Sequence, residues 1–355
     1  MIRLLCIVGS MDVGGAETFL MKIYRVLDRN KYQMDFCVAK GKKGFYEEEI
    51  KDLDGKIYRI TPKTKSIFKN FADIRKIVRD NNYKNVIRIS QNSLSAIELL
   101  AARMGGANNI IFRSSNSSTC GGKKDEFLHR VFRPFANLIS NKKIAPSKEA
   151  GDFMFGRSKY IIINNGVPIE KYHFSQKKRS KYRNELGISD DTIVLGHVGR
   201  FEEQKNHKFL IELFKKYHKI KPNSVLLLIG GGKLGEKIKQ RIMENKLMDS
   251  VKLLGIRSDI SELYSAMDCY IFPSLYEGMP NTVIEAQVSG LPCLVSDKIT
   301  KDCKITENVK FLPLDNPDQW IDSLACLNNM NRIAEIDEKY DIKSVVKDFV
   351  KVVYA

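Results

Sequence analysis

Two glutamates separated by seven residues are the first candidates for chemistry in this sequence. Glu277 lies in a loop rich in glycine and proline, and Glu285 lies about one turn into the predicted helix that follows. A carboxylate beside such a loop suits sugar or ribose hydroxyls, because it accepts charge-assisted hydrogen bonds from them. Backbone N–H groups at the start of the helix, near Asn281 and Thr282, can hold a phosphate. The stretch therefore suits a ligand that carries both hydroxyls and phosphate.

Two cations flank a second loop. Arg200 follows Gly199 at the end of a buried strand-like run, and Lys205 and Asn206 precede a helix predicted to begin near His207. Arginine offers a planar fork of donors and lysine a compact charge, so the two together suit a diphosphate. Most basic residues are solvated surface charges, but a Gly-Arg at a strand end followed closely by Lys-Asn favours a role in binding.

Adjacent glycines occur at two further places. Gly14 and Gly15 come just before a predicted helix, where glycine lets the backbone approach a ligand and the helix start favours an anion. Their spacing differs from the dinucleotide-binding pattern G-x-G-x-x-G, and a tight turn between strand and helix is the alternative interpretation. The run from Gly230 to Gly232 allows the same two interpretations.

The elements that position these residues are strands and helices in alternation. Around the two glutamates, residues 269–272 form an apolar strand, Asn281 or Thr282 caps a helix that Gly290 ends, and residues 291–296 begin the next strand. Ligands bind at the carboxyl ends of strands in an open parallel sheet, where such loops lie. Further strand-like runs occupy residues 1–8, 34–39, 56–60, 86–89, 110–113, 143–145, 160–163, 192–199, 224–229, 251–255 and 309–313. This alternation predicts parallel sheets with helices on both faces, and residues 342–353 are predicted to form the last helix.

Length and cysteine usage restrict the class of protein. A chain of 355 residues with 43% hydrophobic residues is long enough for two globular domains. Its seven cysteines are scattered and form no C-x-x-C pair, which argues for a reducing compartment without a disulfide framework or a zinc site. No apolar run approaches the ~20 residues that span a membrane, and the apolar N-terminus is predicted to be a strand rather than a signal peptide.

The formal charge of +17 calls for an explanation. Residues 56–88 contain ten basic residues against two acids, with apolar residues between them. Such a stretch can lie on an anionic membrane surface, or it can be an ordinary helix whose apolar face packs on the sheet, and the sequence favours neither. Nucleic acid is not expected as a partner, because no recognition motif accompanies the charge.

At the two glutamates, the sequence resembles a known family. The phrase E-G-M-P-N-T-V-I-E followed by A-Q-V-S-G-L-P-C-L-V-S-D, residues 277–297, looks like the E-x7-E signature of retaining glycosyltransferases of family 4. It most resembles bacterial enzymes that build capsular polysaccharides or exopolysaccharides. The phrase G-R-F-x-x-x-K-N, from Gly199 to Asn206, matches the family's second signature, and G-G-A-E at Gly14 is similar to its first loop. The likeness covers most of the second half of the chain strongly and the first half more loosely.

The resemblance implies the GT-B architecture, in which two Rossmann-like domains face each other across a cleft. Residues 1–170 would bind the acceptor and residues 171–340 the nucleotide-sugar, with a linker at about 168–191. Residues 341–355 would form a helix that returns to the first domain.

The resemblance also implies roles for individual residues. Arg200, Lys205 and Glu277 would be catalytic and would act without a metal or other cofactor, with Glu277 on the hydroxyls of the transferred sugar. Glu285 would bind the ribose hydroxyls. Asn116 would contact the acceptor in a loop where relatives often place a histidine and this chain has Ser115. The remaining residues expected to bind the donor are Gly14, Gly15, Gly199, Asn206, Gly230, Ile256, Arg257, Gly278, Met279, Pro280, Asn281 and Thr282.

The function implied in this way is retaining transfer of a sugar from a nucleotide-sugar, with UDP favoured as its carrier. The acceptor would be a lipid-linked cell-surface saccharide at the inner face of the membrane, and the enzyme would be cytoplasmic. A nucleotide-sugar epimerase or hydrolase on a similar fold is the alternative, but it needs an acid/base pair that the sequence does not offer. A third alternative is a basic membrane- or nucleic-acid-binding module without catalysis, against which the complete set of Arg200, Lys205, Glu277 and Glu285 argues.

Overall fold

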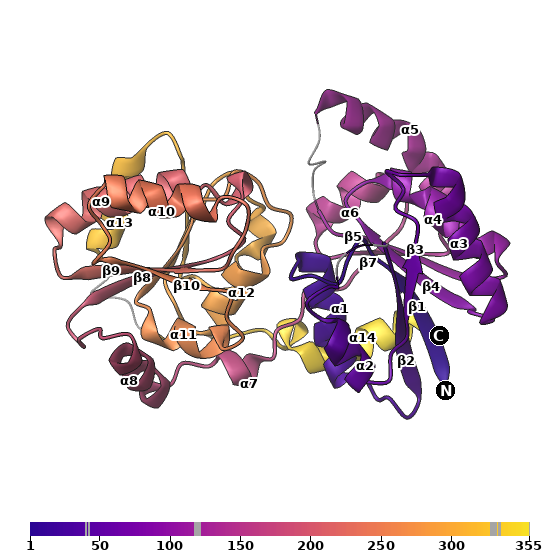
Figure 1. The fold of residues 1–355 in the computed structure, drawn as a ribbon, viewed down its shortest axis with the longest axis horizontal. Coiled ribbons are helices and arrows are strands. Elements are labelled where there is room, and N and C mark those ends of the chain that lie inside the picture. Colours follow the sequence, from indigo (N-terminus) through magenta and orange to yellow (C-terminus); the bar gives the residue numbers. More distant parts are fainter. Residues whose placement is uncertain (40, 42, 117–121, 327–331, 333–334, 355) are drawn as a thin grey trace. The chain divides into compact units, whose positions relative to one another are not determined.

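The computed structural model describes residues 1–39, 41, 43–116, 122–326, 332 and 335–354. The chain divides into two compact units (Figure 1). The first unit contains Met1–Gly166 and Glu338–Ala355, and the second contains Val167–Asp337. The first unit is therefore built from two separate parts of the chain.

A parallel sheet of seven strands forms the centre of the first unit, in the order β3-β2-β1-β4-β5-β6-β7. Each strand is hydrogen-bonded in parallel to its neighbours. The strands are β1 Ile2–Ile7, β2 Tyr32–Ala39, β3 Ile57–Ile60, β4 Asn85–Ser90, β5 Asn109–Ser114, β6 Lys142–Ala145 and β7 Ile161–Ile162.

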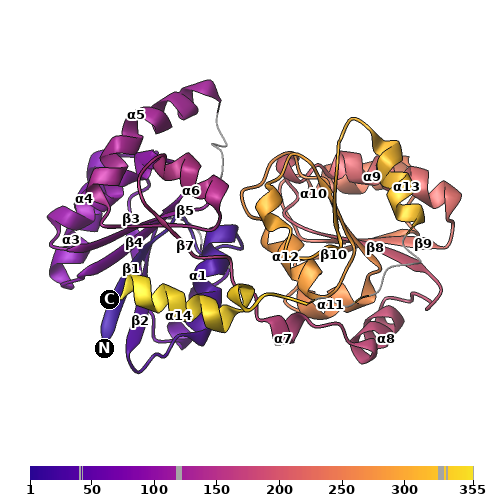
Figure 2. The same cartoon turned by 180° about the vertical axis from the view of Figure 1, so that it is seen from behind.

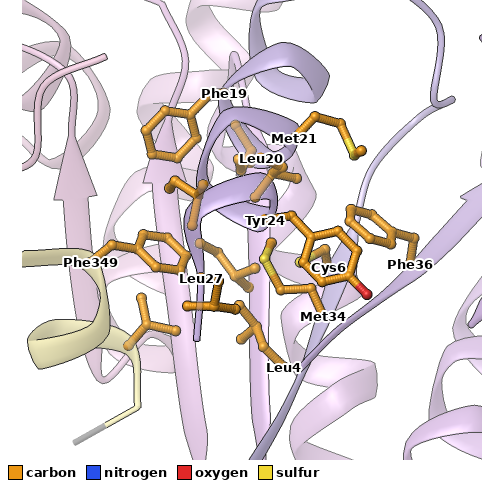
Figure 3. Packing of buried hydrophobic residues seen from close by; sticks show 14 of the residues in the cluster. Leu4, Cys6, Phe19, Leu20, Met21, Tyr24, Leu27, Met34, Phe36 and Phe349 are labelled. Atoms are coloured by element: carbon orange, nitrogen blue, oxygen red, sulfur yellow. The ribbon is translucent and has the colours of Figure 1, made fainter. Parts of the chain in front are cut away.

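Helices cover both faces of this sheet. The first unit contains α1 Gly15–Val26, α2 Glu47–Asp52, α3 Ile67–Asp80, η1 Ser93–Ser95, α4 Ala96–Met104, α5 Lys123–Ile139, α6 Lys148–Phe155, η5 Glu338–Tyr340 and α14 Ile342–Val353. On one face, α1 and α14 pack together, and the rings of Phe19 and Phe349 meet edge to face with centroids 6.2 Å apart (Figures 2 and 3). On the other face, the apolar core includes residues of α3, α4, α5 and α6. Helix α14 thus completes a core whose other members come from residues 4–163.

The second unit has a parallel sheet of six strands, in the order β10-β9-β8-β11-β12-β13. The strands are β8 Ile193–Val198, β9 Ser224–Ile229, β10 Val251–Gly255, β11 Cys269–Phe272, β12 Cys293–Ser296 and β13 Val309–Leu312. The helices are α7 Ile169–Tyr172, α8 Gln176–Glu185, η2 Glu203–Lys205, α9 His207–Ile220, α10 Gly235–Glu244, α11 Ile260–Ala266, α12 Asn281–Val288, η3 Lys301–Cys303 and α13 Pro317–Ala325. The predicted α/β fold with two parallel sheets is confirmed.

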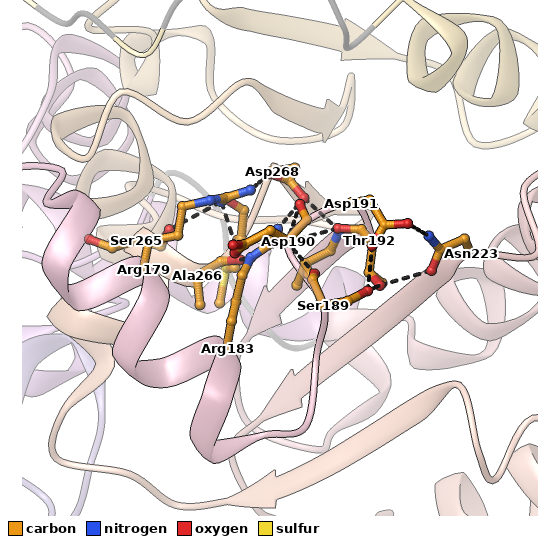
Figure 4. Close-up of polar contacts among 12 residues, drawn as sticks. Arg179, Arg183, Ser189, Asp190, Asp191, Thr192, Asn223, Ser265, Ala266 and Asp268 are labelled. Carbon is orange, nitrogen blue, oxygen red and sulfur yellow. Dashed lines mark hydrogen bonds and ion pairs between the residues drawn. The ribbon is translucent and has the colours of Figure 1, made fainter.

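A group of charged residues fastens α8 to the strand β11 (Figure 4). Arg179 and Arg183 of α8 each donate to one carboxylate oxygen of Asp268, over 2.6 and 2.7 Å. Asp268 also accepts a hydrogen bond from the backbone N–H of Val194, over 2.7 Å. The side chain of Arg183 is fully buried, so this carboxylate neutralises a charge that water cannot reach.

Most of the described cysteines are buried. Within the described residues, Cys6, Cys37, Cys269, Cys293 and Cys303 are free and buried, and Cys326 is free and exposed. Cys120 lies outside the described residues.

Candidate functional site

Three loops of the second unit meet at the carboxyl edge of its sheet. They follow β8, β9 and β11, and β8 lies between the other two strands. The backbone N–H of Phe201 donates to Gly231 O over 2.9 Å, and that of Leu275 donates to Gln204 O over 2.8 Å. The loop after β8 is therefore hydrogen-bonded to both of its neighbours.

Glycine is required where the first two loops touch. Gly230 has a φ of +140°, and a Cβ at this residue would lie 2.0 Å from Gly199 O. Gly232 has a φ of +153°, and its Cβ would lie 2.8 Å from Phe201 O. Any larger residue would force the loops apart, so close packing of these loops accounts for Gly230 and Gly232.

Lys205 and Glu277 are brought together across two of these loops. Lys205 Nζ lies 2.5 Å from Glu277 Oε1, and both side chains are mostly buried, with 14% and 13% exposed. The same ammonium lies 4.6 Å from the ring centroid of Phe272, the last residue of β11, in a cation–π contact. Arg200, by contrast, is half exposed and lies 3.1 Å from Glu202 Oε1. The loops thus hold one fixed cation and one that reaches into solvent.

Hydrogen bonds also hold the backbone of the Glu277 loop. The side-chain amide of Gln204 donates to Tyr276 O over 2.8 Å. Glu277 forms a parallel bridge with Ile299, beyond the end of β12. Gln204 was not recognised from the sequence, because glutamine in a loop carries no pattern that distinguishes it from a surface residue.

Helix α12 begins immediately after this loop without a side-chain cap. Its N-cap is Pro280, and Asn281 is the first helical residue, so the prediction that Asn281 or Thr282 caps the helix is wrong. Proline has a fixed φ that allows it to precede a helix, but it has no side-chain acceptor for the helix N–H groups. Among the described residues, the buried Oδ1 of Asn281 and the Oγ of Ser274 have no hydrogen-bond partner. The helix start therefore offers polar groups to a ligand.

Glu285 projects from the second turn of α12 and is only 5% exposed. The hydroxyl of Tyr264 lies 3.5 Å from Glu285 Oε2 and 3.1 Å from Thr282 O. Burial raises the pKa of Tyr264 well above its usual value, so this hydroxyl remains a donor. Gly278, Met279 and Pro280 are buried between the two glutamates.

Two buried histidines lie beneath the loop after β8. The rings of His197 and His207 meet edge to face, with centroids 4.9 Å apart. Nδ1 of His197 lies 2.8 Å from Ile271 O, whereas its Nε2 and both ring nitrogens of His207 have no partner among the described residues. Burial lowers the pKa of His207 to about 4 and that of His197 well below its usual value. The prediction that His197 is a core residue is confirmed for its burial, but only one of its nitrogens is satisfied.

Three other residues were expected to bind the donor, and each of them has its own surroundings in the structure. Asn206 has a left-handed backbone with φ 52°, and its Oδ1 caps α9 by accepting from the N–H of Phe209. Ile256 is 65% exposed just after β10. Arg257 forms an ion pair with Asp259. The structure thus gives Asn206 a role in folding and leaves Ile256 open to solvent.

The predicted residues Gly14, Gly15 and Asn116 belong to the first unit. Gly14 is the N-cap of α1, and a Cβ at this position would lie 2.4 Å from Glu17 Oε2. Gly15 is the first residue of the helix. Asn116 is 6% exposed just after β5, and its carbonyl accepts from Ser114 Oγ over 3.0 Å.

A buried arginine near Asn116 was missed in the sequence. Arg113 is 2% exposed, stacks 3.6 Å over the ring of Phe19 and donates to Asn165 Oδ1 over 2.7 Å. Burial lowers its pKa to about 9. Its place at the end of a strand-like run was visible, but nothing in the sequence shows that it points inward.

The described part of the chain lacks two kinds of feature. No group of three or more His, Cys, Asp or Glu side chains there is placed to hold a metal ion. None of its helices combines the length and apolar character of a membrane span.

The two parallel sheets, with the loop cluster at the carboxyl edge of the second, define a protein of the GT-B class. The same fold occurs in Anabaena HepE, crystallised with UDP and glucose, with a TM-score of 0.81 and 20% identity over 100% of both chains. It also occurs in TarM, with a TM-score of 0.73 and 15% identity over 100% of this chain and 99% of the other.

A family model described as glycosyl transferases group 1 matches residues 178–325. The chain is 32% identical over 307 residues to the putative glycosyltransferase EpsF of Bacillus subtilis strain 168, covering 84% of this chain and 80% of that protein. It is 25% identical over 323 residues to the capsular polysaccharide biosynthesis glycosyltransferase CapH of Staphylococcus aureus, covering 87% and 85%. It is also 25% identical over 293 residues to an Escherichia coli UDP-Gal:alpha-D-GlcNAc-diphosphoundecaprenol alpha-1,3-galactosyltransferase, covering 79% and 75%. The chain therefore belongs to the group 1 family of glycosyltransferases.

Proposed function

We propose that this glycosyltransferase moves a sugar from a UDP-sugar to a growing lipid-linked saccharide and retains the anomeric configuration, as an enzyme of family 4. The observation that carries the proposal is the Lys205–Glu277 ion pair, which joins two loops at the carboxyl edge of a parallel sheet. This edge is where open α/β sheets bind ligands. A fixed cation and carboxylate at this edge match a ligand that presents both phosphates and hydroxyls.

In this proposal, positive charge stabilises the departing diphosphate. An ammonium has three N–H donors, so Lys205 can keep its bond to Glu277 and still donate to a phosphate oxygen. Arg200 is exposed and can close over the second phosphate with its planar fork. The uncapped N–H groups of α12 face the same negative charge. We propose that these groups carry out this role without a metal.

The carboxylates have separate roles in the proposal. Glu277 accepts hydrogen bonds from hydroxyls of the transferred sugar, and the buried Glu285 accepts those of the ribose. The acceptor hydroxyl then forms the new bond to the anomeric carbon on the face from which the diphosphate departs with the bonding electron pair. Its proton passes to the departing phosphate oxygen. Attack on this face retains the anomeric configuration.

Named relatives support the donor and the acceptor class. HepE was crystallised with UDP, and the Escherichia coli relative is named for UDP-galactose and a diphosphoundecaprenol acceptor. EpsF and CapH are named as glycosyltransferases, CapH of capsular polysaccharide biosynthesis. We therefore place the reaction in the assembly of a cell-surface polysaccharide at the cytoplasmic face of the membrane.

A thermal-shift panel of nucleoside diphosphates and nucleotide-sugars tests the donor site. A ligand at ~100 times its Kd adds ~2.7 kcal/mol of stability, so one UDP-sugar should raise the Tm of the wild-type protein. Glu285→Ala should abolish this shift, whereas Glu244→Ala, an exposed carboxylate at the end of α10, should preserve it. No shift with any nucleotide-sugar would overturn the proposed donor. Turnover of the donor without an acceptor would favour an epimerase or hydrolase, and an inverted product would overturn retention.

A further inference from the structure

Helix α5 has an apolar face that the described residues of its own unit leave exposed. Phe127, Val131 and Leu138 are 66%, 55% and 78% exposed. They lie four and seven residues apart, a spacing that aligns side chains along one side of a helix. The exposed Pro134 lies between them on the same side. We call these four residues the α5 stripe.

The buried face of α5 lies on the other side of the helix. His129, Ala136 and Ile139 are 1%, 0% and 3% exposed, and Ala136 and Ile139 belong to the core of the first unit. At 100° per residue, His129 and Ala136 lie opposite the stripe. A surface helix normally has one apolar face, which packs on the core. A second apolar face turned to solvent indicates an interaction surface.

Basic residues border the α5 stripe. Helical periodicity places the exposed Lys124 on one flank of the stripe and Arg130 on the other. The acids of the helix, Asp125 and Glu126, lie farther round, and Glu126 forms an ion pair with Arg130 over 2.6 Å. The face that carries the apolar side chains is therefore cationic at its borders.

A second exposed apolar pair occurs at the start of α3. Ile67 and Phe68 are 52% and 89% exposed, with the exposed Lys65 and Lys69 beside them. Helices α3 and α5 follow β3 and β5 and therefore begin at the same edge of the sheet. Both contact α4, and all three contribute to the core on one face of the sheet (Figure 1). The pair and the α5 stripe thus belong to the same layer of helices.

The sequence alone did not decide whether the basic stretch at residues 56–88 lies on a membrane or packs as an ordinary helix. The structure gives different answers for its two parts. Its later apolar residues, Ile74 and Val78, are fully buried, as in an ordinary packed helix. Its two exposed large apolar residues are Ile67 and Phe68, at the start of α3. The α5 stripe lies outside that stretch and was not recognised from the sequence.

We propose that an anionic phospholipid bilayer covers the surface formed by the α5 stripe and the Ile67–Phe68 pair. Apolar side chains bordered by lysine and arginine suit the interface of such a bilayer, where the rings enter the acyl boundary and the cations meet phosphates. If a second copy of the chain docked on this surface with its own identical surface, the lysines and arginines of the two copies would repel each other. Nucleic acid would leave the apolar side chains without a partner. The proposal does not depend on the donor or the reaction.

Vesicle co-sedimentation of the full-length protein tests the surface. We expect binding to vesicles that contain phosphatidylglycerol and much weaker binding to phosphatidylcholine alone. Phe127→Ser, Val131→Ser and Leu138→Ser together should lower the partition coefficient at least ~10-fold, and each of Lys124→Gln and Arg130→Gln about 5-fold. Met243→Ser, an exposed apolar residue on α10 of the second unit, is the matched control and should bind like the wild type.

A fluorescent variant gives a direct reading of insertion. The single tryptophan, Trp320, is fully buried, so Phe127→Trp adds one exposed reporter. Its emission should shift to the blue with phosphatidylglycerol vesicles and stay unchanged with phosphatidylcholine. The proposal would be overturned if the triple variant bound vesicles as strongly as the wild type, or if the wild type did not bind them at all. A dimer that the triple substitution converts to monomer, without an effect on vesicle binding, would assign the surface to a second copy instead.

Discussion

Lys205 Nζ lies 2.5 Å from Glu277 Oε1, although 72 positions separate the two residues in the sequence. The contact exists because β8 and β11 are neighbours in the sheet, whereas the two strands between them in the chain, β9 and β10, both lie on the other side of β8. Each partner shields the other from the cost of a mostly buried, uncompensated charge. The pair therefore combines a role in folding with the role proposed in phosphate binding.

Replacing either partner should separate these two roles. Lys205→Ala should lower kcat by ~10²–10³-fold, because the departing diphosphate loses a fixed cation. Glu277→Gln should lower it as well, and the double variant should lose less than the product of the single effects, since one unit is disrupted in each case. Steady-state kinetics of the four proteins measure this coupling. The exposed pair Arg241 and Glu212, 3.4 Å apart, is the matched control. A Lys205→Ala enzyme with wild-type kcat would contradict the assigned role.

Gly230→Ala should destabilise the second unit. The substitution places a Cβ 2.0 Å from Gly199 O on a backbone with φ +140°, so both the conformation and the contact are strained. We expect the free energy of unfolding to fall by ~1–3 kcal/mol, measured by denaturant titration. Gly235→Ala is the control, because its Cβ meets only Phe201 Cδ2 at 3.9 Å. Equal midpoints for the two variants would show that the loops can separate freely.

The protein should become less stable as the pH is lowered, because of His207. Its pKa is about 4 in the folded protein and 6.5 ordinarily, so between these values the unfolded chain binds a proton that the folded one does not. The free energy of unfolding should therefore decrease as pH falls from 6.5 to 4, by about 3 kcal/mol for this residue.

Denaturant titrations of wild type and His207→Phe across this range measure the effect. The variant should lose a corresponding part of the pH dependence. His173→Gln, at an exposed histidine, should keep it. An identical slope in wild type and His207→Phe would show that the histidine charges without difficulty in the folded state.

Asp268→Asn should unfold the second unit more readily without affecting catalysis. The fully buried Arg183 would lose its carboxylate, and we expect a loss of ~2–4 kcal/mol, reduced somewhat because Asp268 is 26% exposed. Asp318→Asn removes an exposed surface partner of Lys216 and should cost less than ~1 kcal/mol. Asp268 precedes β11, whereas Glu277 follows it, so kcat should remain close to wild type in both variants. A large loss of kcat in Asp268→Asn would show that the two ends of the strand are coupled.

Helices and strands could be predicted from the sequence more accurately than the contacts between side chains. Strands 224–229, 251–255 and 269–272 and the helix 342–353 are confirmed at both ends. Most of these segments are apolar or strongly periodic and are bounded by polar residues, glycine or proline. The strand predicted at residues 291–296 begins only at Cys293, since Pro292 has no N–H to pair.

The predicted site is partly explained by the same reasoning. Glycines and charged residues after strands could be assigned to one edge of the sheet, because all parallel strands end there. The Lys205–Glu277 pair could not, because it depends on the order of the strands, which local patterns do not reveal. The uncapped start of α12 was missed for a different reason: residue preferences favour asparagine as a cap, but the turn through Pro280 moves Asn281 one position into the helix.

Helix α14 has a consequence for the order of events on the ribosome. Ile342, Val345 and Phe349 belong to the core of the first unit, beside side chains of β1 and α1. That unit is therefore the first to emerge during synthesis and the last to acquire all its residues. The second unit is continuous from Val167 to Asp337 and has every contact it needs earlier. A nascent chain that pauses before residue 338 would leave the apolar side of α1 without its partner α14, and exposed apolar surface of this kind is prone to aggregation.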